Sequence, residues 1–153
     1  MPLIFRHIQD SDIELILQYI HELHNLTHVK FIEKQSRNHI SKKTFKYLKT
    51  HPDSGQIYVF DCDNEVIGYA IVINSWSNEY GGIILNIDEI FVDEKYRNQR
   101  VATSFLEYLS REFQETAMGI ELEALPSNHE LMNFYDKCGF KKSEYALLYR
   151  PIE

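Results

Sequence analysis

The stretch IILNIDEIFVDEKYRNQRVAT, residues 83–103, predicts the centre of the fold. Residues 83–92 are apolar at both odd and even positions, which is typical of a central strand covered on two faces. A polar loop follows, and residues 101–117 then predict an amphipathic helix. A helix that starts just after a strand offers unpaired N–H groups and the positive end of its dipole, so this junction is a potential anion site.

The segments before this stretch predict a strand, two helices and a hairpin. Residues 3–8 are typical of a short strand, and QDSD then supplies capping residues for a helix over 13–23. A second helix is predicted within 38–49, where THPDSGQ ends the periodic pattern. Two runs rich in β-branched and aromatic residues, 57–62 and 66–74, flank the polar turn DNE and predict a β-hairpin.

The segments after the stretch predict a strand over 119–125, a short helix over 128–138 stopped by Gly139, and strand or hairpin structure over 140–150. The whole order predicts an α/β fold of the mixed-sheet (α+β) kind, with about seven strands flanked by about four helices on both faces. A chain of 153 residues without repeats or linkers is expected to form a single domain, residues 1–153.

Composition and charge narrow the class of protein. The hydrophobic fraction of 44% and the charged fraction of 25% exclude a disordered chain. A net charge of −7 argues against a nucleic-acid partner and favours a cationic one. No signal-peptide pattern and no apolar run of about 20 residues is present, so a cytoplasmic protein with no membrane partner is expected. Cys62, expected in a strand, and Cys138 lack metal or redox spacing and are expected to be reduced thiols.

Three successive segments carry a family resemblance: IDEIFVDEKYRNQRVATSFLEYL, IELEALPSN and LMNFYDKCGF. Together they resemble the GNAT superfamily of acetyl-CoA-dependent N-acetyltransferases. The resemblance covers residues 55–150 well and the N-terminal third by element order. In that family a central strand leads to an Arg/Gln-x-x-Gly-x-Gly/Ala loop that cradles the coenzyme A pyrophosphate. Residues 97–102 occupy its six positions, and only the middle glycine is replaced outright, by Arg100.

The resemblance also implies how the cofactor is held. It places the backbone of Ile90, Phe91 and Val92 against the pantetheine arm, at a strand splayed from its neighbour. It places the amides of residues 98–103 on the pyrophosphate. The loop residues that it assigns to cofactor binding are Arg97, Asn98, Gln99, Arg100, Val101, Ala102 and Thr103.

The later segment implies two further contacts. Asn128 would contact the pantetheine region, and Tyr135 would face the coenzyme's sulfur and protonate the departing thiolate. A phenol suits that role because its ordinary pKa of about 10 keeps it protonated at neutral pH. The residues alone also allow another interpretation, in which Tyr135 packs under the sheet and Asn128 caps a helix.

The acceptor amine must be neutral to react, so a carboxylate base is expected. Asp88 and Glu89 lie inside an apolar strand, where an unpaired buried carboxylate is costly. Glu123 shares a face of the next strand with Glu121. Asp88, Glu89 and Glu123 are all candidate bases. The alternation of side chains along a strand does not choose among them, because a bulge at the splayed point would change which side chains share a face. Ion pairs with Lys or Arg are the structural alternative for each acid.

In the family, segments 20–40 and 75–82 wall the acceptor pocket. Here they hold aromatic, acidic and imidazole side chains that suit a cationic amine but also suit ordinary core and surface positions: His21, His24, His28, Trp76, Glu79 and Tyr80. The histidines also suggest a metal site. Their spacing misses the His-Glu-x-x-His pattern because Asn25 stands where the second histidine is required, so no metal is expected.

The expected function is direct transfer of acetyl from acetyl-CoA, as co-substrate, to a primary amine of a small cationic molecule or a peptide. Polyamines, aminoglycosides, amino acids and peptide N-termini all fit, and a homodimer is possible because dimers are common in the family. A catalytically inactive GNAT-like binding module with an altered loop is the first alternative, and a metal-dependent hydrolase is the second. The missing glycine would abolish the site only if position 100 needs a positive φ or if its Cβ faces the ligand. If residues 99–102 form the first helical turn, Arg100 is unstrained and its N–H stays available. Arg100 is expected to keep the site working.

Overall fold

The computed structural model describes residues 2–27 and 37–152. The chain divides into two compact units, Met1–Glu123 and Ala124–Glu153, and each is described by itself. The first unit contains the sheet and three of the helices, and the second contains one helix and the C-terminal segment.

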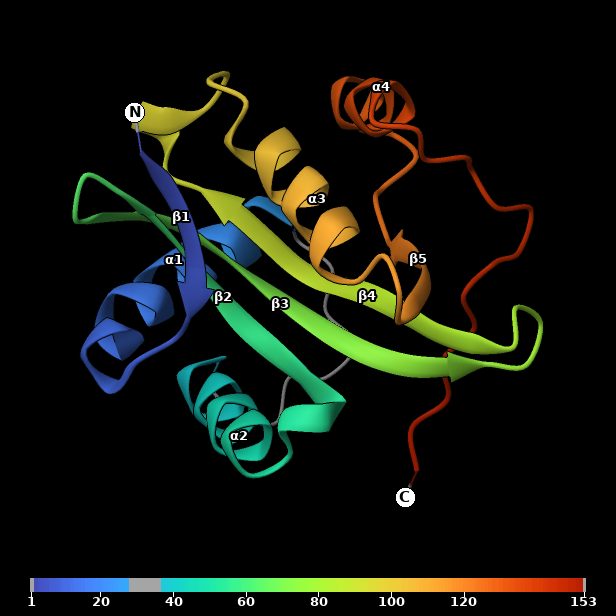
Figure 1. Ribbon diagram of the computed structural model, residues 1–153, viewed down its shortest axis with the longest axis horizontal. Helices are drawn as coiled ribbons and strands as arrows, with labels where there is room; N and C mark the ends of the chain where they lie inside the picture. Colours follow the sequence, from blue (N-terminus) through green and yellow to red (C-terminus); the bar gives the residue numbers. More distant parts are fainter. Residues whose placement is uncertain (1, 28–36, 153) are drawn as a thin grey trace. The chain divides into compact units, whose positions relative to one another are not determined.

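The first unit is built on a five-stranded mixed sheet with the strand order β1-β2-β3-β4-β5 (Figure 1). The first four strands are antiparallel neighbours, and β5 runs parallel to β4. The strands are β1 (Leu3–His7), β2 (Gly55–Cys62), β3 (Glu65–Ser77), β4 (Gly82–Val92) and β5 (Ala117–Leu122).

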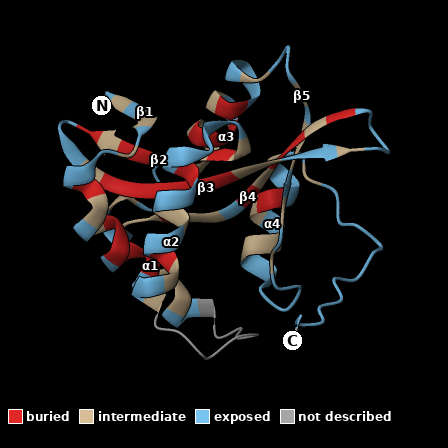
Figure 2. Cartoon of the chain, turned by 90° about the horizontal axis from the view of Figure 1, so that it is seen from below, coloured by how far each residue is buried: buried red, intermediate tan, exposed pale blue. Residues whose placement is uncertain are grey.

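Helices cover both faces of this sheet, as the sequence predicts. Figure 2 shows α1 (Ile13–Thr27) and α2 (Arg37–Thr50) on one face and α3 (Val101–Glu112) on the other. Short 3-10 helices occupy Asp10–Asp12, Pro52–Ser54 and Glu94–Tyr96. None of the described helices is long and apolar enough to cross a membrane.

Each face of the sheet buries its own cluster, because successive strand residues point to opposite sides. On the α1 face, Ile16 and Ile20 pack with Tyr69, Ile71 and Phe91. On the α3 face the cluster is aromatic and contains Phe5, Tyr58, Phe60, Phe105 and Tyr108.

The predicted β2–β3 hairpin is confirmed. Its two turn residues, Asp63 and Asn64, have φ values of 53° and 63°. A two-residue type I′ hairpin turn needs positive φ at both central positions, because its twist then matches that of the two strands. Asp and Asn tolerate positive φ well. Cys62 and Cys138 are not joined in a disulfide bond, and Cys62 is buried in β2.

The prediction for the end of α3 is wrong by five residues. The helix ends at Glu112, and the N–H of Ala117 bonds the carbonyl of Phe113 across a turn. The polar run Gln-Glu-Thr after Phe113 offers no apolar side chain to the buried helix face, so the amphipathic pattern stops there. Ala117 instead pairs with Ile83 at the start of β5, two residues before the predicted strand.

The predictions of about seven strands and of a strand over 140–150 are also wrong, since the described residues form five strands. In the second unit, α4 (His129–Lys137) ends as predicted, before Gly139 at φ +94°. The described part of that unit contains no strand with which 140–150 could pair. A strand needs a hydrogen-bonded neighbour, and Tyr145 and Leu148 are exposed.

Candidate functional site

The central strand β4 carries a bulge beside the candidate bases. Ile71 on β3 pairs with Glu89, whereas the next residue, Val72, pairs with Ile87. Asp88 is therefore the extra residue of a β-bulge. The bulge changes the alternation of side chains at this point, which is why the parity of the sequence could not rank Asp88 and Glu89.

The strand β4 separates from β5 at the same place. Parallel pairing runs from Ile83 to the pair Ile87–Leu122 and ends there, while β4 continues to Val92. The backbone groups of residues 88–92 on the β5 side therefore have no partner on β5. This matches the splayed strand that the family resemblance implies at Ile90, Phe91 and Val92.

The loop after β4 delivers free N–H groups to the start of α3. The first α3 bond joins the N–H of Ser104 to the carbonyl of Arg100 at 2.9 Å. Helix geometry then leaves the amides of Val101, Ala102 and Thr103 without an intrahelical acceptor. Asn98 and Arg100 have φ values of 60° and 63°. Gln99 and Val101 do not have positive φ values. Such alternation of the sign of φ is typical of backbone nests, in which successive N–H groups bind an anion.

Arg100 does not lie in the first helical turn, so the condition under which it would be unstrained is not met. It is the N-cap of α3 in the left-handed region, where a non-glycine residue costs about 1–2 kcal/mol. This explains the glycine of the family pattern at this position, because glycine adopts the left-handed conformation without strain. The Arg100 guanidinium lies 3.5 Å from the carboxylate of Glu107, and both side chains are exposed on α3. That contact directs the side chain along the helix.

Two other loop side chains fix the loop to the end of β4. Arg97 Nε donates to the carbonyl of Val92 at 2.9 Å, and its guanidinium lies 5.3 Å from the ring centroid of Phe91. Gln99 Nε2 donates to the carbonyl of Lys95 at 3.1 Å. These contacts hold the loop backbone against the end of β4.

Glu89 is held at both carboxylate oxygens. The hydroxyl of Tyr69 donates to Oε1 at 2.8 Å, and His24 Nε2 lies 2.9 Å from Oε2. Burial and the neighbouring Glu89 carboxylate raise the pKa of Tyr69, so its hydroxyl keeps its proton and acts as donor. His24 belongs to the predicted acceptor wall, whereas no local sequence pattern points to Tyr69. Only the pairing register of β3 and β4 brings Tyr69 close to Glu89.

Asp88 differs from Glu89 in its electrostatics. Asp88 is exposed on the bulge, whereas Glu89 is half-buried. Partial desolvation of the carboxyl group and the negative charges of Glu89 and Glu123 nevertheless raise the pKa of Asp88, whereas His24 lowers it. The three candidate bases are therefore close enough to act on one another. Glu123 directly follows the end of β5, and Glu121 is exposed on that strand.

In the second unit, Asn128 caps α4 as the alternative interpretation has it, and Tyr135 packs against aromatic residues of the same unit. Tyr135 is buried on α4, where its ring lies 5.2 Å from Phe134 and 5.5 Å from Phe140 between centroids. Burial, with a smaller contribution from Cys138, raises the pKa of Tyr135 to about 12. Asn128 Oδ1 accepts the N–H of Leu131 at 3.1 Å as the N-cap. Their roles toward a coenzyme stay predictions.

The predicted acceptor wall is described only in part. Trp76 and Tyr80 are exposed near the β3–β4 turn, with Glu79 exposed between them. His21 is exposed on α1, while His28 lies outside the described residues. Within residues 2–27 and 37–152, no group of three or more His, Cys, Asp or Glu side chains has the arrangement of a metal site.

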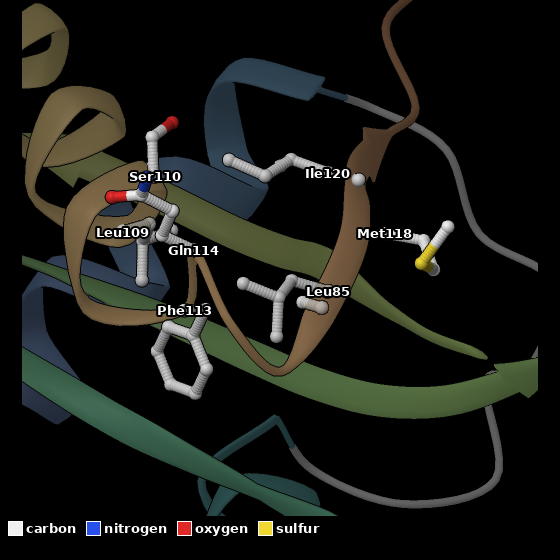
Figure 3. Close-up of a pocket in the computed structure, with 9 residues that line it drawn as sticks. Leu85, Leu109, Ser110, Phe113, Gln114, Met118 and Ile120 are labelled. Atoms are coloured by element: carbon white, nitrogen blue, oxygen red, sulfur yellow. The ribbon is translucent and has the colours of Figure 1, made fainter.

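A cavity of about 180 Å³ lies between α3, β4 and β5 (Figure 3). Figure 3 shows Leu85, Leu109 and Phe113 at its centre, with Ile120 beside them. Sites for small molecules are typically about 300–1,000 Å³. None of the predicted cofactor or catalytic residues lines this cavity, so we do not assign it to the coenzyme.

A family comparison covers the part of the chain that holds β4, the loop after it and α3. A sequence profile described as an acetyltransferase (GNAT) domain matches residues 53–142, more than half of the chain. The chain belongs to the GNAT acetyltransferase family. The match extends from the start of β2 through the loop and α4. A search of curated proteins finds no match.

Solved structures share the GNAT fold over nearly the whole chain. A possible acetyltransferase from Clostridium difficile 630 has a TM-score of 0.83 at 17% identity and covers 100% of this chain and 99% of that chain. Glucosamine-6-phosphate N-acetyltransferase from Arabidopsis thaliana has a TM-score of 0.71 at 15% identity, with coverage of 98% and 99%. An aminoglycoside acetyltransferase from an uncultured soil metagenomic sample, in complex with sisomicin, has a TM-score of 0.71 at 12% identity, with coverage of 99% and 97%. At these identities the likeness shows the fold.

Proposed function

We propose that this GNAT protein transfers acetyl from acetyl-CoA directly to a primary amine. The observation that carries the proposal is the end of β4–β5 pairing at Ile87, just before a loop with unpaired amides. The free backbone groups of β4 can hydrogen-bond the amides of a pantetheine arm in the manner of an added strand. Because the family match runs through both compact units, the proposal treats residues 1–153 as one catalytic domain.

The pyrophosphate would bind the backbone rather than side chains. The alternating positive φ values at Asn98 and Arg100 and the free amides at the start of α3 support this part of the proposal. Ile90, Phe91 and Val92 would contact pantetheine, as the family resemblance implies. Arg97 would act by holding the loop against Val92 and Phe91.

We assign the proton acceptor to Asp88 within the cluster of three carboxylates. Two donors stabilise the charge of Glu89, which suits it to bind the substrate's ammonium group. The raised pKa of Asp88 suits it to accept a proton. The neutral nitrogen then attacks the thioester carbonyl carbon, a C–N bond forms, the C–S bond breaks and the thiolate leaves, while the remaining surplus proton on nitrogen passes to solvent. Tyr135 would give this thiolate its proton, a role that rests on the family resemblance.

The same cluster supports a cationic substrate. Asp88, Glu89 and Glu123 place negative charge at the splay of a chain whose net charge is −7. Small polyamines, aminoglycosides and basic peptides all carry a primary amine beside further positive charge. We propose this chemical class for the acceptor.

Two measurements test the proposal together. Titration calorimetry with acetyl-CoA should show saturable binding, and undetectable binding would overturn the proposal. A thiol-release assay with spermidine, sisomicin, lysine and a basic peptide should then show turnover that depends on the amine. The uncharged amine glycinamide, measured above its pKa, is the matched probe for the role of extra positive charge.

The left-handed conformation of Arg100 favours one alternative, a GNAT-like module that no longer binds the coenzyme. In that case the native protein would fail to bind acetyl-CoA, and Arg100→Gly would restore binding. Tight binding by the native protein contradicts this alternative. The contact of Arg100 with Glu107, which directs its side chain along α3, supports the active form.

A further inference from the structure

A second cavity, of about 540 Å³, lies in the first unit between α2, the start of β2 and the segment that joins β1 to α1. Its size falls within the range typical of small-molecule sites. It shares no lining residue with the anion loop 97–103 or with the carboxylate cluster. In Figure 1, α2 lies beside the start of β2, and Figure 2 places it on the sheet face opposite α3.

The cavity floor is apolar and rests on the core. Leu48 and Ile57 belong to the buried cluster and are only 4% and 1% exposed. Ile8, Ile13 and Phe45 line the same floor but are half-buried. The N–H of Ile8 bonds the carbonyl of Ile57 at 3.0 Å, which ties one wall to β2. The floor is therefore part of the packed structure, and apolar surface is left open to a ligand.

The cavity rim is positive. Lys42, Lys46 and Lys49 line it at spacings of three and four residues, which place them on one face of α2. Like charges at these spacings destabilise a helix. Asp10, the acidic side chain among the lining residues, lies 3.7 Å from Lys49 in an exposed pair that contributes little. The chain has 23 acidic and 16 basic residues, so this rim is opposite in sign to the whole protein.

We propose that this cavity binds a small carboxylate with an apolar body, a medium-chain fatty acid in its simplest form. The carboxylate would accept charge-assisted hydrogen bonds from the lysines on α2. The apolar body would cover Ile8, Ile13 and Phe45 and remove them from water. This is a binding site separate from the proposed acetyl transfer, and it does not depend on that function.

The test is a calorimetric titration with decanoate below its micelle-forming concentration, repeated with decanol and with decyltrimethylammonium. Decanoate should bind saturably, decanol more weakly, and the cation not at all. Lys46→Glu should weaken decanoate binding by about tenfold, the effect of losing one charge-assisted bond. Lys43→Glu makes the same charge change on the same helix outside the cavity lining, and should alter binding less than about threefold.

Methyl NMR of the wild-type protein locates the site. Shifts should concentrate at Ile8, Ile13, Leu48 and Ile57 and persist when coenzyme A is saturating. The proposal is overturned if decanoate gives no saturable response, if the two Lys→Glu variants weaken binding equally, or if the shifts fall outside these methyl groups. Because acetyl transfer enters none of these readouts, failure here leaves the proposed enzyme function untouched.

Discussion

The hydroxyl of Tyr69 on β3 donates a hydrogen bond to Glu89 Oε1 on β4 at 2.8 Å, across the strand pair that carries the bulge at Asp88. Tyr69 is fully buried and belongs to the core beneath α1. The bond therefore joins the hydrophobic core to the carboxylate cluster of the proposed site. With His24 at the second oxygen, Glu89 is held in one orientation.

Tyr69→Phe should lower the free energy of unfolding by about 1–3 kcal/mol, because Glu89 Oε1 then loses its donor in a sheltered place. Urea unfolding measures this loss. A double-mutant cycle with Glu89→Gln should give a coupling energy of at least about 0.5 kcal/mol. Tyr80→Phe, at an exposed turn position, is the control and should be neutral. Additive effects of the Tyr69 and Glu89 changes would refute the coupling.

Asp88→Asn should reduce kcat/KM for the amine by about 10²–10⁴-fold, the usual contribution of a positioned base. The sign of the pH dependence follows from the raised pKa of Asp88: the carboxylate is available above that pKa and is lost as pH falls through it. In the wild-type protein, the fall of kcat/KM at low pH should thus have an apparent pKa above the ordinary Asp value of 3.8. This fall should be absent in Asp88→Asn. Glu121→Gln should keep both the rate and this fall, and an unchanged profile in Asp88→Asn would exclude Asp88 as the base.

Arg100→Gly should be more stable than Arg100→Ala by about 1 kcal/mol, because glycine accepts the left-handed conformation and alanine does not. Thermal unfolding of the two variants measures the difference. Both variants should bind acetyl-CoA, since the amides at the start of α3 remain. A loss of more than about 2.7 kcal/mol, or about a hundredfold, in Arg100→Ala would contradict backbone-dominated binding.

Asp12→Asn should lower the free energy of unfolding of the first unit by about 2 kcal/mol at pH 7. Breaking a fully buried ion pair would cost more, but Arg6 is partly exposed and solvent screens the interaction. Arg6 donates to both Asp12 oxygens at 2.8 and 2.9 Å and lowers the pKa of Asp12. A lowered carboxyl pKa stabilises the fold above the unfolded value of 3.8, and the contribution is lost as pH falls through the folded value.

Acid unfolding followed by circular dichroism tests this linkage. The difference in stability between wild type and Asp12→Asn should shrink as pH falls below 3.8. Asp61→Asn is the matched control, because Asp61 makes a single, longer bond of 3.3 Å to Arg6 and should cost less. A difference that stays constant with pH would mean that Asp12 acts through packing alone.

Tyr135→Phe should lower kcat by about 10²-fold and leave the affinity for acetyl-CoA within about threefold, if its hydroxyl protonates the thiolate. Because burial raises the pKa of Tyr135 to about 12, the hydroxyl stays protonated through the accessible pH range. The alkaline limb of the profile should therefore not come from this residue. Phe134→Leu, on the same helix, is the control, and equal losses in both variants would indicate a packing role for Tyr135.

Local patterns in the sequence predicted most of the elements. The β2–β3 turn is an example, because Asp63 and Asn64 favour positive φ whatever surrounds them. The end of α3 was less predictable, since Ala117 leaves the helix to pair with Ile83 on a strand more than thirty positions earlier. The absence of a strand over 140–150 has the same origin, because pairing depends on a neighbour that the segment's own residues do not specify.

By itself, the sequence determined the order of most helices and strands and the strand-loop-helix junction at residues 83–103. These follow from short-range periodicity, capping and motif spacing. Only the tertiary structure decided that Asp88 is the bulged residue, that Glu89 is held by Tyr69 and His24, and that Arg100 takes a glycine-like conformation. The physical reason is that register and bulges are set by hydrogen bonds between strands distant in the chain, and those bonds exist only once the sheet has formed. The conformation of Arg100 depends in turn on how the loop joins the end of β4 to the start of α3.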